Sequence, residues 1–177
     1  MCLIAFAIGA SSRWPLLIAS NRDEFFDRPA AALMRWQTET GQDIISGRDL
    51  RAGGAWLGMT PQGRVAMLTN VRELPAAAGE AAAQKSRGEL VIRWLETDMN
   101  ADQFMAQTDN TAYGGFNLVL GDLQTGNWNW LSNRSFDRLA TGAGAHRPAN
   151  TGWTSQVLSP GIYGLSNAAL NTPWPKT

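Results

Sequence analysis

Short apolar segments separated by turn-forming residues are the feature that most restricts the fold of this chain. Residues 2–8 and 16–20 are apolar and flank the turn-rich stretch 9–15, which predicts an antiparallel hairpin of two buried strands. Such a hairpin brings the residues after its second strand back towards the start of its first. We therefore expect Asp23 to lie near Cys2.

The pattern of strands and turns continues after the hairpin. Residues 44–70 contain a glycine pair at 53–54 and the sequence Thr60-Pro61-Gln62-Gly63, whose proline and glycine positions are typical of a type I turn. This segment predicts a β-meander. Residues 76–83 are rich in alanine and glycine and are predicted to be a loose connector.

A helical region is predicted next. Ser86 and Glu89 have the spacing of a capping box and precede apolar residues at helical intervals. A second short helix is expected to begin near Asn100 and to bury Phe104. The middle of the chain is therefore predicted to form two helices.

The last part of the chain returns to strands, which are expected at residues 115–120, 127–131 and 161–165. Residues 140–160 are predicted to be a long irregular loop. Strands, then helices, then strands predict an α+β fold with mainly antiparallel sheets. A length of 177 residues fits one domain, 1–177.

The cysteine and histidine content excludes several kinds of chemistry. The chain has one cysteine, Cys2, and one histidine, His146, which lies in a stretch rich in glycine, alanine and proline. An intrachain disulfide, a Cys/His zinc cluster and a multi-histidine site cannot be built from these residues. We expect no metal and no cofactor.

Charge and hydropathy limit the partners. The formal net charge is zero and the sequence has no basic run, so we expect no binding to nucleic acid. No stretch approaches the roughly 20 apolar residues of a membrane-spanning helix. The apolar residues 3–10 have no positive residue before them, unlike a secretory signal. We expect a cytoplasmic protein whose partner is a small-molecule ligand or substrate.

Cys2 follows Met1 directly. Removal of Met1 would leave one residue with both a thiol and a free α-amine, whose ordinary pKa of roughly 7.7–8.0 lets it accept a proton near neutral pH. A nucleophile with its own base is the arrangement of N-terminal nucleophile hydrolases. The alternative is a small buried residue at the start of a strand.

Ordered motifs extend over nearly the whole chain. They are Met1-Cys2-Leu3-Ile4, Asn21-Arg22-Asp23-Glu24-Phe25, Arg28-Pro29, Ser46-Gly47-Arg48-Asp49, Gly53-Gly54-Ala55-Trp56-Leu57-Gly58, Leu68-Thr69-Asn70, Gly88-Glu89-Leu90, Gly115-Phe116-Asn117-Leu118, Tyr163-Gly164-Leu165-Ser166-Asn167 and Thr172-Pro173-Trp174. In this order they resemble the NRDE protein family, whose animal members are called transport and Golgi organisation protein 2. The resemblance implies an N-terminal nucleophile hydrolase-like fold, a four-layer αββα sandwich.

Members of that family continue beyond the position of Lys176, so the resemblance implies a sandwich that is C-terminally incomplete here. An open sheet edge or apolar face would then allow self-association.

More distantly, the motifs resemble the choloylglycine hydrolase and penicillin V acylase group, and this resemblance implies roles for individual residues. Cys2 would attack an amide or thioester carbonyl, with its own α-amine as the proton acceptor. Asp23 would hold that amine. Asn70 and Asn167 would stabilise the tetrahedral oxyanion.

The same resemblance implies that Asn21 and Arg22 shape the substrate-binding site, with Arg22 pairing with a substrate carboxylate. Structural roles remain open for these residues, because Asp23 and Arg22 could form an ion pair or cap a turn. Asn70 and Asn167 stand at strand ends, where asparagine is common in turns. One departure from the acylase group is Ser20, which stands where that group has an arginine.

Three functions therefore stay open. The first is a cysteine N-terminal nucleophile amidohydrolase acting on a small acylated amide. The second is a non-catalytic protein of the same family that binds a hydrophobic, acyl or haem-like ligand in trafficking or homeostasis. The third is an inactive fragment that keeps only the fold.

Overall fold

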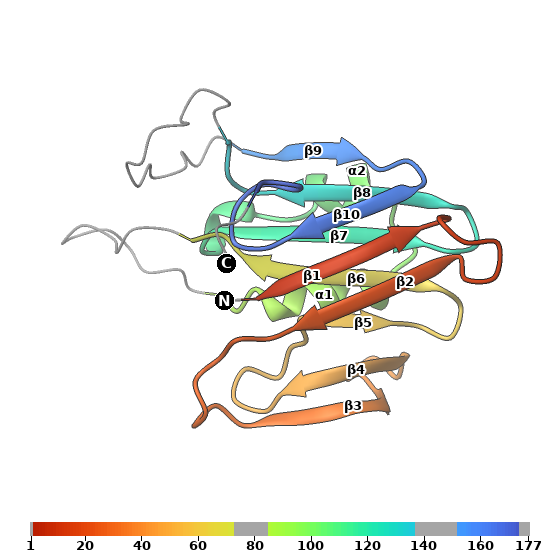
Figure 1. The fold of residues 1–177 in the computed structure, drawn as a ribbon. Helices are drawn as coiled ribbons and strands as arrows, with labels where there is room; N and C mark the ends of the chain where they lie inside the picture. The colour runs from red at the N-terminus through yellow and green to blue at the C-terminus, as the bar shows by residue number, and fades with distance from the viewer. Residues whose placement is uncertain (1, 73–84, 137–151, 174–177) are drawn as a thin grey trace.

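The computed structural model describes residues 2–72, 85–136 and 152–173 of the chain. Two predicted features, the connector at 76–83 and the stretch around His146, lie outside the described residues. The described part consists mainly of antiparallel strands with two short helices (Figure 1).

The smaller sheet has the strand order β10-β1-β2 and contains the predicted hairpin. Its strands are β1 (Leu3–Ile8), β2 (Leu16–Asn21) and β10 (Gly161–Leu165). Both pairings are antiparallel, and Ala5 of β1 lies opposite Ala19 of β2 and Gly164 of β10. The side chains of β1 alternate, since Ile4, Phe6 and Ile8 are buried while Leu3 and Ala5 are exposed. The predicted hairpin and the predicted last strand are confirmed, but the prediction that both hairpin strands are buried is wrong, because β2 has no buried side chain and β1 is buried on one face only.

The larger sheet contains the other strands of the described residues, in sequence order from edge to edge. They are β3 (Ala30–Gln37), β4 (Asp43–Asp49), β5 (Leu57–Met59), β6 (Arg64–Asn70), β7 (Phe116–Asp122), β8 (Asn127–Ser132) and β9 (Thr154–Val157). Every neighbouring pair is antiparallel. The predicted meander over residues 44–70 is therefore confirmed.

Two expectations about this sheet need correction. Strand β3 was not predicted from the sequence, and the predicted irregular loop at 140–160 contains β9 in its described part. Both are edge strands, and most of their side chains are exposed. An edge strand that buries little has no alternating apolar pattern that could reveal it in the sequence.

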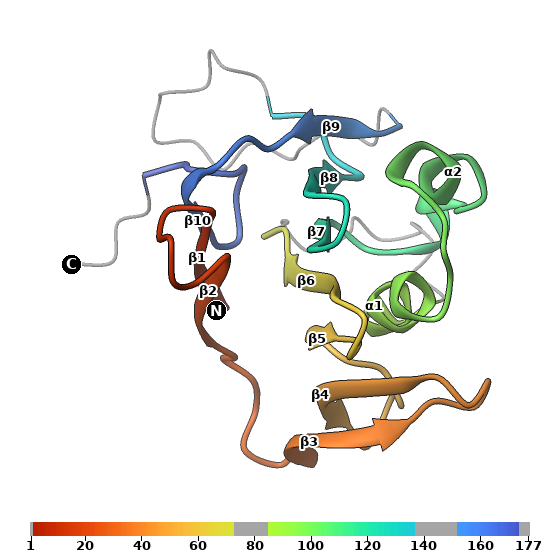
Figure 2. The same cartoon turned by 90° about the vertical axis from the view of Figure 1, so that its right-hand side faces the viewer.

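Helices α1 (Gly88–Leu95) and α2 (Ala101–Ala106) cover one face of the larger sheet, and the smaller sheet lies against its other face (Figure 2). The predicted second helix is confirmed. Its cap is the Asn100 side chain, which accepts from the Gln103 N–H, while the Gln103 side chain accepts from the Asn100 N–H. A short 3-10 turn, Asn110–Ala112, follows it.

The capping box predicted at Ser86 and Glu89 is wrong, although the helix that it introduces is present. The N-cap position is Arg87, and it has no side-chain cap. Glu89 instead accepts a hydrogen bond from the Tyr113 hydroxyl and lies 3.6 Å from the Lys85 ammonium. Burial and this hydrogen bond to Glu89 raise the pKa of Tyr113, which keeps its hydroxyl protonated as a donor.

Two apolar cores fill the spaces between the layers. The first lies between the helices and the larger sheet and includes Leu90, Trp94, Phe104, Phe116 and Leu118. The second lies between the two sheets and includes Ile4, Phe6, Val65, Met67, Val119, Trp128 and Leu165. Strands β6 and β7 contribute side chains to both cores.

The α+β class with mainly antiparallel sheets is confirmed, and the described residues form three layers: helices, the larger sheet and the smaller sheet. The fourth layer of an αββα sandwich stays a prediction, as does the assignment to the N-terminal nucleophile hydrolase fold. Among the helices of the described residues, none is long and apolar enough to cross a membrane.

Candidate functional site

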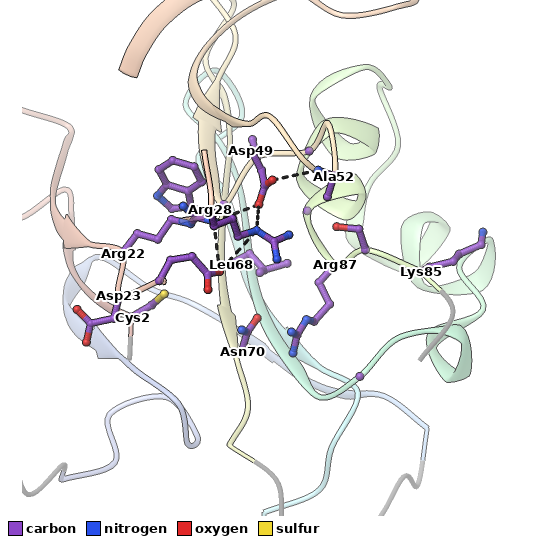
Figure 3. Close-up of a pocket in the computed structure, with 17 residues that line it drawn as sticks. Cys2, Arg22, Asp23, Arg28, Asp49, Ala52, Leu68, Asn70, Lys85 and Arg87 are labelled. Atoms are coloured by element: carbon purple, nitrogen blue, oxygen red, sulfur yellow. Dashed lines mark hydrogen bonds and ion pairs between the residues drawn. The ribbon is translucent and has the colours of Figure 1, made fainter. Parts of the chain in front are cut away.

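A pocket of about 340 Å³ opens where the start of β1 meets the end of β6. Cys2, which directly precedes β1, and Asn70, the last residue of β6, both line it. Arg22 and Asp23 line it from the segment after β2. Four of the predicted site residues thus share one pocket, and the hairpin geometry had implied the proximity of two of them, Cys2 and Asp23 (Figure 3).

The position of Cys2 is fixed from the segment that follows β10. The Ser166 hydroxyl donates a hydrogen bond to the Cys2 carbonyl at 2.9 Å. The next residue, Asn167, donates from Nδ2 to the Asn70 carbonyl at 2.7 Å, and its own carbonyl accepts from the Arg72 N–H at 2.8 Å. Asn167 does not line the pocket but holds the end of β6 against this segment.

A buried polar network holds the segment after β10 in place. Its residues were not among the site residues predicted from the sequence. The Thr69 hydroxyl donates to the Ser166 carbonyl, and Asn117 Nδ2 donates to the Ala168 carbonyl at 2.8 Å. Trp130 Nε1 donates to Asn117 Oδ1 at 3.2 Å. These bonds join β6, β7 and β8 to the segment after β10, so that Cys2 and Asn70 are presented by rigid elements.

The residues of this network lie in the ordered motifs of the sequence. Thr69 belongs to Leu68-Thr69-Asn70, Asn117 to Gly115-Phe116-Asn117-Leu118, and Ser166 to Leu165-Ser166-Asn167. Each polar residue lies in or directly after an apolar strand. The sequence could not show that three motifs so distant along the chain meet in space.

Asn21 ends β2 and orients the next carboxylate. Its Nδ2 donates to Asp23 Oδ1 at 3.1 Å. Asn21 lies opposite Leu3 in the pairing of β1 with β2, which places the following residues beside Cys2. Asn21 does not itself line the pocket, whereas Asp23 does. The substrate-binding role of Asn21 stays a prediction.

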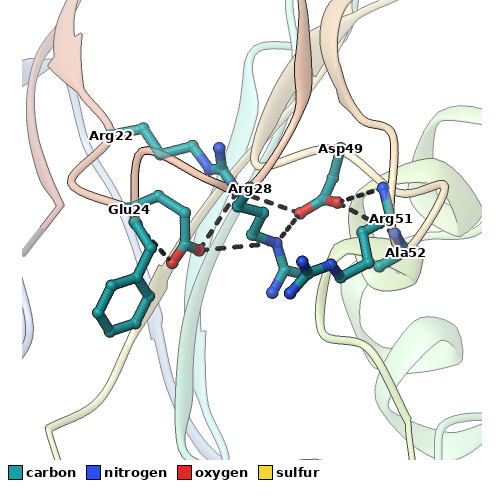
Figure 4. Close-up of polar contacts among 7 residues, drawn as sticks. Arg22, Glu24, Arg28, Asp49, Arg51 and Ala52 are labelled. Carbon is teal, nitrogen blue, oxygen red and sulfur yellow. Dashed lines mark hydrogen bonds and ion pairs between the residues drawn. The ribbon is translucent and has the colours of Figure 1, made fainter.

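Arg22 belongs to a cluster of charged side chains on the wall of the pocket (Figure 4). Its Nη2 donates to Asp49 Oδ2 at 3.1 Å and to Glu24 Oε2 at 3.3 Å. The guanidinium also lies over the Trp56 ring, 4.6 Å from its centroid. Arg28 Nε donates to the same Asp49 oxygen at 2.7 Å. These contacts fasten the segment after β2 to the larger sheet.

Asp49 has partners on both carboxylate oxygens. While Oδ2 accepts from the two arginines, Oδ1 accepts from the backbone N–H groups of Arg51 and Ala52, each at 3.0 Å. Burial favours a higher pKa for Asp49, but the Ala52 N–H, the Arg28 side chain and the Arg51 N–H outweigh it. The pKa of this carboxyl is therefore below its ordinary value, and Asp49 stays ionised.

The pocket brings together side chains of the kinds that acyl transfer uses. A thiol, a carboxylate and an amide lie around one pocket, which is the set that a cysteine nucleophile with an oxyanion donor requires. Within the described ranges, no group of three or more His, Cys, Asp or Glu side chains could hold a metal ion.

Comparison with known proteins gives a consistent result. The family model "Transport and Golgi organisation 2" matches residues 1–177. The chain is 35% identical over 191 residues to the Transport and Golgi organization 2 homolog of Mus musculus, covering 99% of this chain and 60% of that protein. It is 35% identical over 188 residues to the homolog of Homo sapiens, with the same coverage. The Drosophila melanogaster protein is 29% identical over 133 residues, which are 67% of this chain and 45% of that protein.

The chain thus spans about 60% of the length of these mammalian relatives. Several of the segments that resemble the NRDE family in sequence surround the pocket, since Cys2, Arg22, Asp49, Trp56 and Asn70 all line it. With the family model matched along the whole chain, we conclude that this protein belongs to the Transport and Golgi organisation 2 family.

Proposed function

We propose that this protein is a cysteine N-terminal nucleophile amidohydrolase that acts on a small acylated amide. The observation that carries the proposal is the shared pocket of Cys2, Asp23 and Asn70. The chain has no second cysteine, so any thiol chemistry depends on Cys2. The proposal requires that Met1 be removed, because the base is the α-amine of Cys2.

The reaction would proceed in two halves. The α-amine takes the thiol proton, and the thiolate attacks the carbonyl carbon to form a C–S bond. The tetrahedral intermediate collapses as the C–N bond breaks, and the leaving amine receives the proton. Water then attacks the thioester, which releases the carboxylic acid and restores the thiol.

Neighbouring residues would support these steps. Asp23, oriented by Asn21, holds the α-amine. Asn70 donates to the oxyanion from its side chain, and Asn167 keeps Asn70 in place through the Asn70 carbonyl. Arg22 shapes the wall of the pocket while its guanidinium contacts Asp49 and Glu24.

Intact mass and hydrolysis of a panel of acyl amides test this proposal. We expect a mass lower by one methionine, rapid alkylation of Cys2 by iodoacetamide, and turnover that Cys2→Ala abolishes. Asn70→Ala should lower the rate by about 10²–10³. The matched control is Asn127→Ala, at the exposed start of β8, which should leave the rate unchanged. Equal turnover by the wild type and Cys2→Ala would refute the proposal.

A second candidate function is favoured by the relatives, which are named for transport and Golgi organisation. In that case the pocket would bind a hydrophobic, acyl or haem-like ligand without cleaving it. Binding that persists in Cys2→Ala, with no turnover in the wild type, would support this function over the first.

A further inference from the structure

The two groups that the proposed reaction needs come from different sheets. Cys2 directly precedes β1 of the smaller sheet, and Asn70 ends β6 of the larger sheet. Both line the pocket (Figure 3). Because β1 and β6 belong to separate sheets, strand pairing within either sheet does not fix the distance between the Cys2 thiol and the Asn70 amide. A connection between the sheets must set this distance.

The register of the smaller sheet shows where the pairing of β1 with β10 ends. Ile4 lies opposite Leu165, the last residue of β10, and Cys2 lies two residues before Ile4. There the Ser166 hydroxyl donates to the Cys2 carbonyl at 2.9 Å, while its contact with Asn167 Oδ1 is longer, 3.4 Å. A side-chain hydroxyl thus connects Cys2 to the segment after β10, beyond the last paired residues.

Ser166 is itself held by the larger sheet. Its carbonyl accepts a hydrogen bond from the hydroxyl of Thr69, the residue that precedes Asn70 in β6. Asn167, the residue after Ser166, donates from Nδ2 to the Asn70 carbonyl at 2.7 Å. The two dipeptides are thus joined by two hydrogen bonds that run in opposite directions. Thr69, Ser166 and Asn167 are all buried, which strengthens these bonds.

We propose that Ser166 is a positioning residue that sets the distance between the Cys2 thiol and the Asn70 amide. The proposal rests on the proposed function, because it concerns the nucleophile and the oxyanion donor of that reaction. Ser166 acts through the main chain of Cys2, and its neighbour Asn167 acts through the main chain of Asn70, so that one dipeptide locates both groups. An oxyanion donor is effective only within about 2.7–3.1 Å of the oxyanion, so a small displacement of the thiol weakens it.

Two reagents separate the reactivity of the thiol from its position relative to Asn70. With iodoacetamide, the Cys2 thiolate forms a C–S bond, the C–I bond breaks and iodide leaves. With p-nitrophenyl acetate, the thiolate attacks the carbonyl carbon, an oxyanion forms and collapses, and the C–O bond breaks to release p-nitrophenolate and leave an acetyl thioester. Since only acetylation needs an oxyanion donor, the measurement is the ratio of the acetylation to the alkylation rate constant at one pH, after subtraction of the rates of Cys2→Ala.

Removal of the Ser166 hydroxyl should lower this ratio. We expect a decrease of about tenfold to 10²-fold in Ser166→Ala, the range for misplaced reacting groups, with little change in alkylation alone. Ser166→Thr keeps a hydroxyl and should restore most of the ratio. The matched control is Thr108→Val, because the Thr108 hydroxyl is also buried and donates to a backbone carbonyl, that of Phe104 at 2.6 Å, but Thr108 does not line the pocket. This control should lower the melting temperature without changing the ratio.

A double substitution tests whether Ser166 acts through the distance to Asn70. Asn70→Ala removes the donor and should lower the ratio by itself. In that background Ser166→Ala should have little further effect, because the distance to a donor that is absent no longer matters. Additive losses would show that Ser166 acts through stability or through another group, and would overturn the proposal. All ratios are measured well below the melting temperature of each variant.

The outcomes distinguish the two proposals, because one acetylation of Cys2 is sufficient for the ratio. Acetylation that depends on Ser166, without turnover of any acyl amide, would refute the hydrolase and support the positioning role. Turnover of amides with an unchanged ratio in Ser166→Ala would overturn the positioning role and leave the hydrolase. An equal decrease in Thr108→Val would also overturn the positioning role. A thiol that reacts with neither reagent would overturn both proposals.

Discussion

In the larger sheet, β6 and β7 have almost no exposed side chain, whereas β1 of the smaller sheet alternates between buried and exposed ones. The difference follows from the layers, because helices cover one face of the larger sheet and the smaller sheet covers the other. In the smaller sheet, Leu17 and Ile162 lie on either side of Ala7 in one row, and they are 48% and 78% exposed. Strands β1 and β2 are largely apolar in sequence although one of their faces is exposed, so an apolar sequence does not by itself report how many faces of a strand are covered.

The largest expected effect is in the strand that is covered on both faces. Leu118 of β7 is fully buried in the core under the helices. Leu118→Ala should lower the free energy of unfolding by about 2–5 kcal/mol, since it removes apolar contacts and leaves a cavity. Urea denaturation measures this change. A loss well below 1 kcal/mol would show that the helix layer packs loosely on the sheet.

A pair of glycines compares the two sheets directly. A Cβ at Gly121 of β7 would lie 2.2 Å from the Trp128 ring, while a Cβ at Gly164 of β10 would meet nothing within 4 Å. Gly121→Ala should destabilise the protein by about 1–3 kcal/mol through overpacking. Gly164→Ala should be neutral within about 0.5 kcal/mol. Thermal and urea unfolding of both variants measure these changes in stability. Equal effects of the two substitutions would contradict the predicted difference in packing between the two sheets.

Asp49 tests the connection between the sheets. Its folded-state pKa is lowered, so the stability that it contributes is present above its ordinary pKa of about 3.9 and is lost as the pH falls through the folded-state value. Asp49→Asn should cost about 1 kcal/mol at neutral pH. This difference from wild type should shrink as the solution is acidified below about pH 4.

Asp43→Asn is the matched control for Asp49, since Asp43 stands at the other end of β4 and pairs with Arg35 at 2.6 Å in an exposed position. A solvent-exposed pair contributes little, so its replacement should have the smaller effect at neutral pH. The reverse order would show that the cluster around Arg22 does not fasten the segment after β2.

The smallest expected effect is on the outer face of the smaller sheet. Ile162→Ser should change the free energy of unfolding of the monomer by no more than about 0.5 kcal/mol, because the side chain is already exposed. The predicted self-association is tested with the same variant by sedimentation over a range of concentrations. A dimer in the wild type that is lost in Ile162→Ser would assign the interface to this face.

Local patterns in the sequence were sufficient for the hairpin, the turn at residues 60–63 and the helix that begins after Asn100. The turn is closed by the Gly63 N–H, which donates to the Thr60 carbonyl at 3.0 Å. In each case the groups that form the structure are a few residues apart, so that propensity and hydrogen bonding act within one segment. The proximity of Cys2 and Asp23 was predictable for the same reason, since one hairpin joins them.

Contacts between distant segments decided the rest. Glu89 forms a hydrogen bond with Tyr113 and not a capping box with Ser86, and Tyr113 is too distant along the chain for a local pattern to show this. The edge strands β3 and β9 form because a neighbouring strand pairs with each of them. The sequence by itself determined which segments are strands or helices where their own residues supply the hydrogen bonds and the apolar pattern. Only the tertiary structure decided that Arg22 binds Asp49 and that Asn167 holds Asn70. These residues are far apart along the chain, and their side chains meet only in the packed structure.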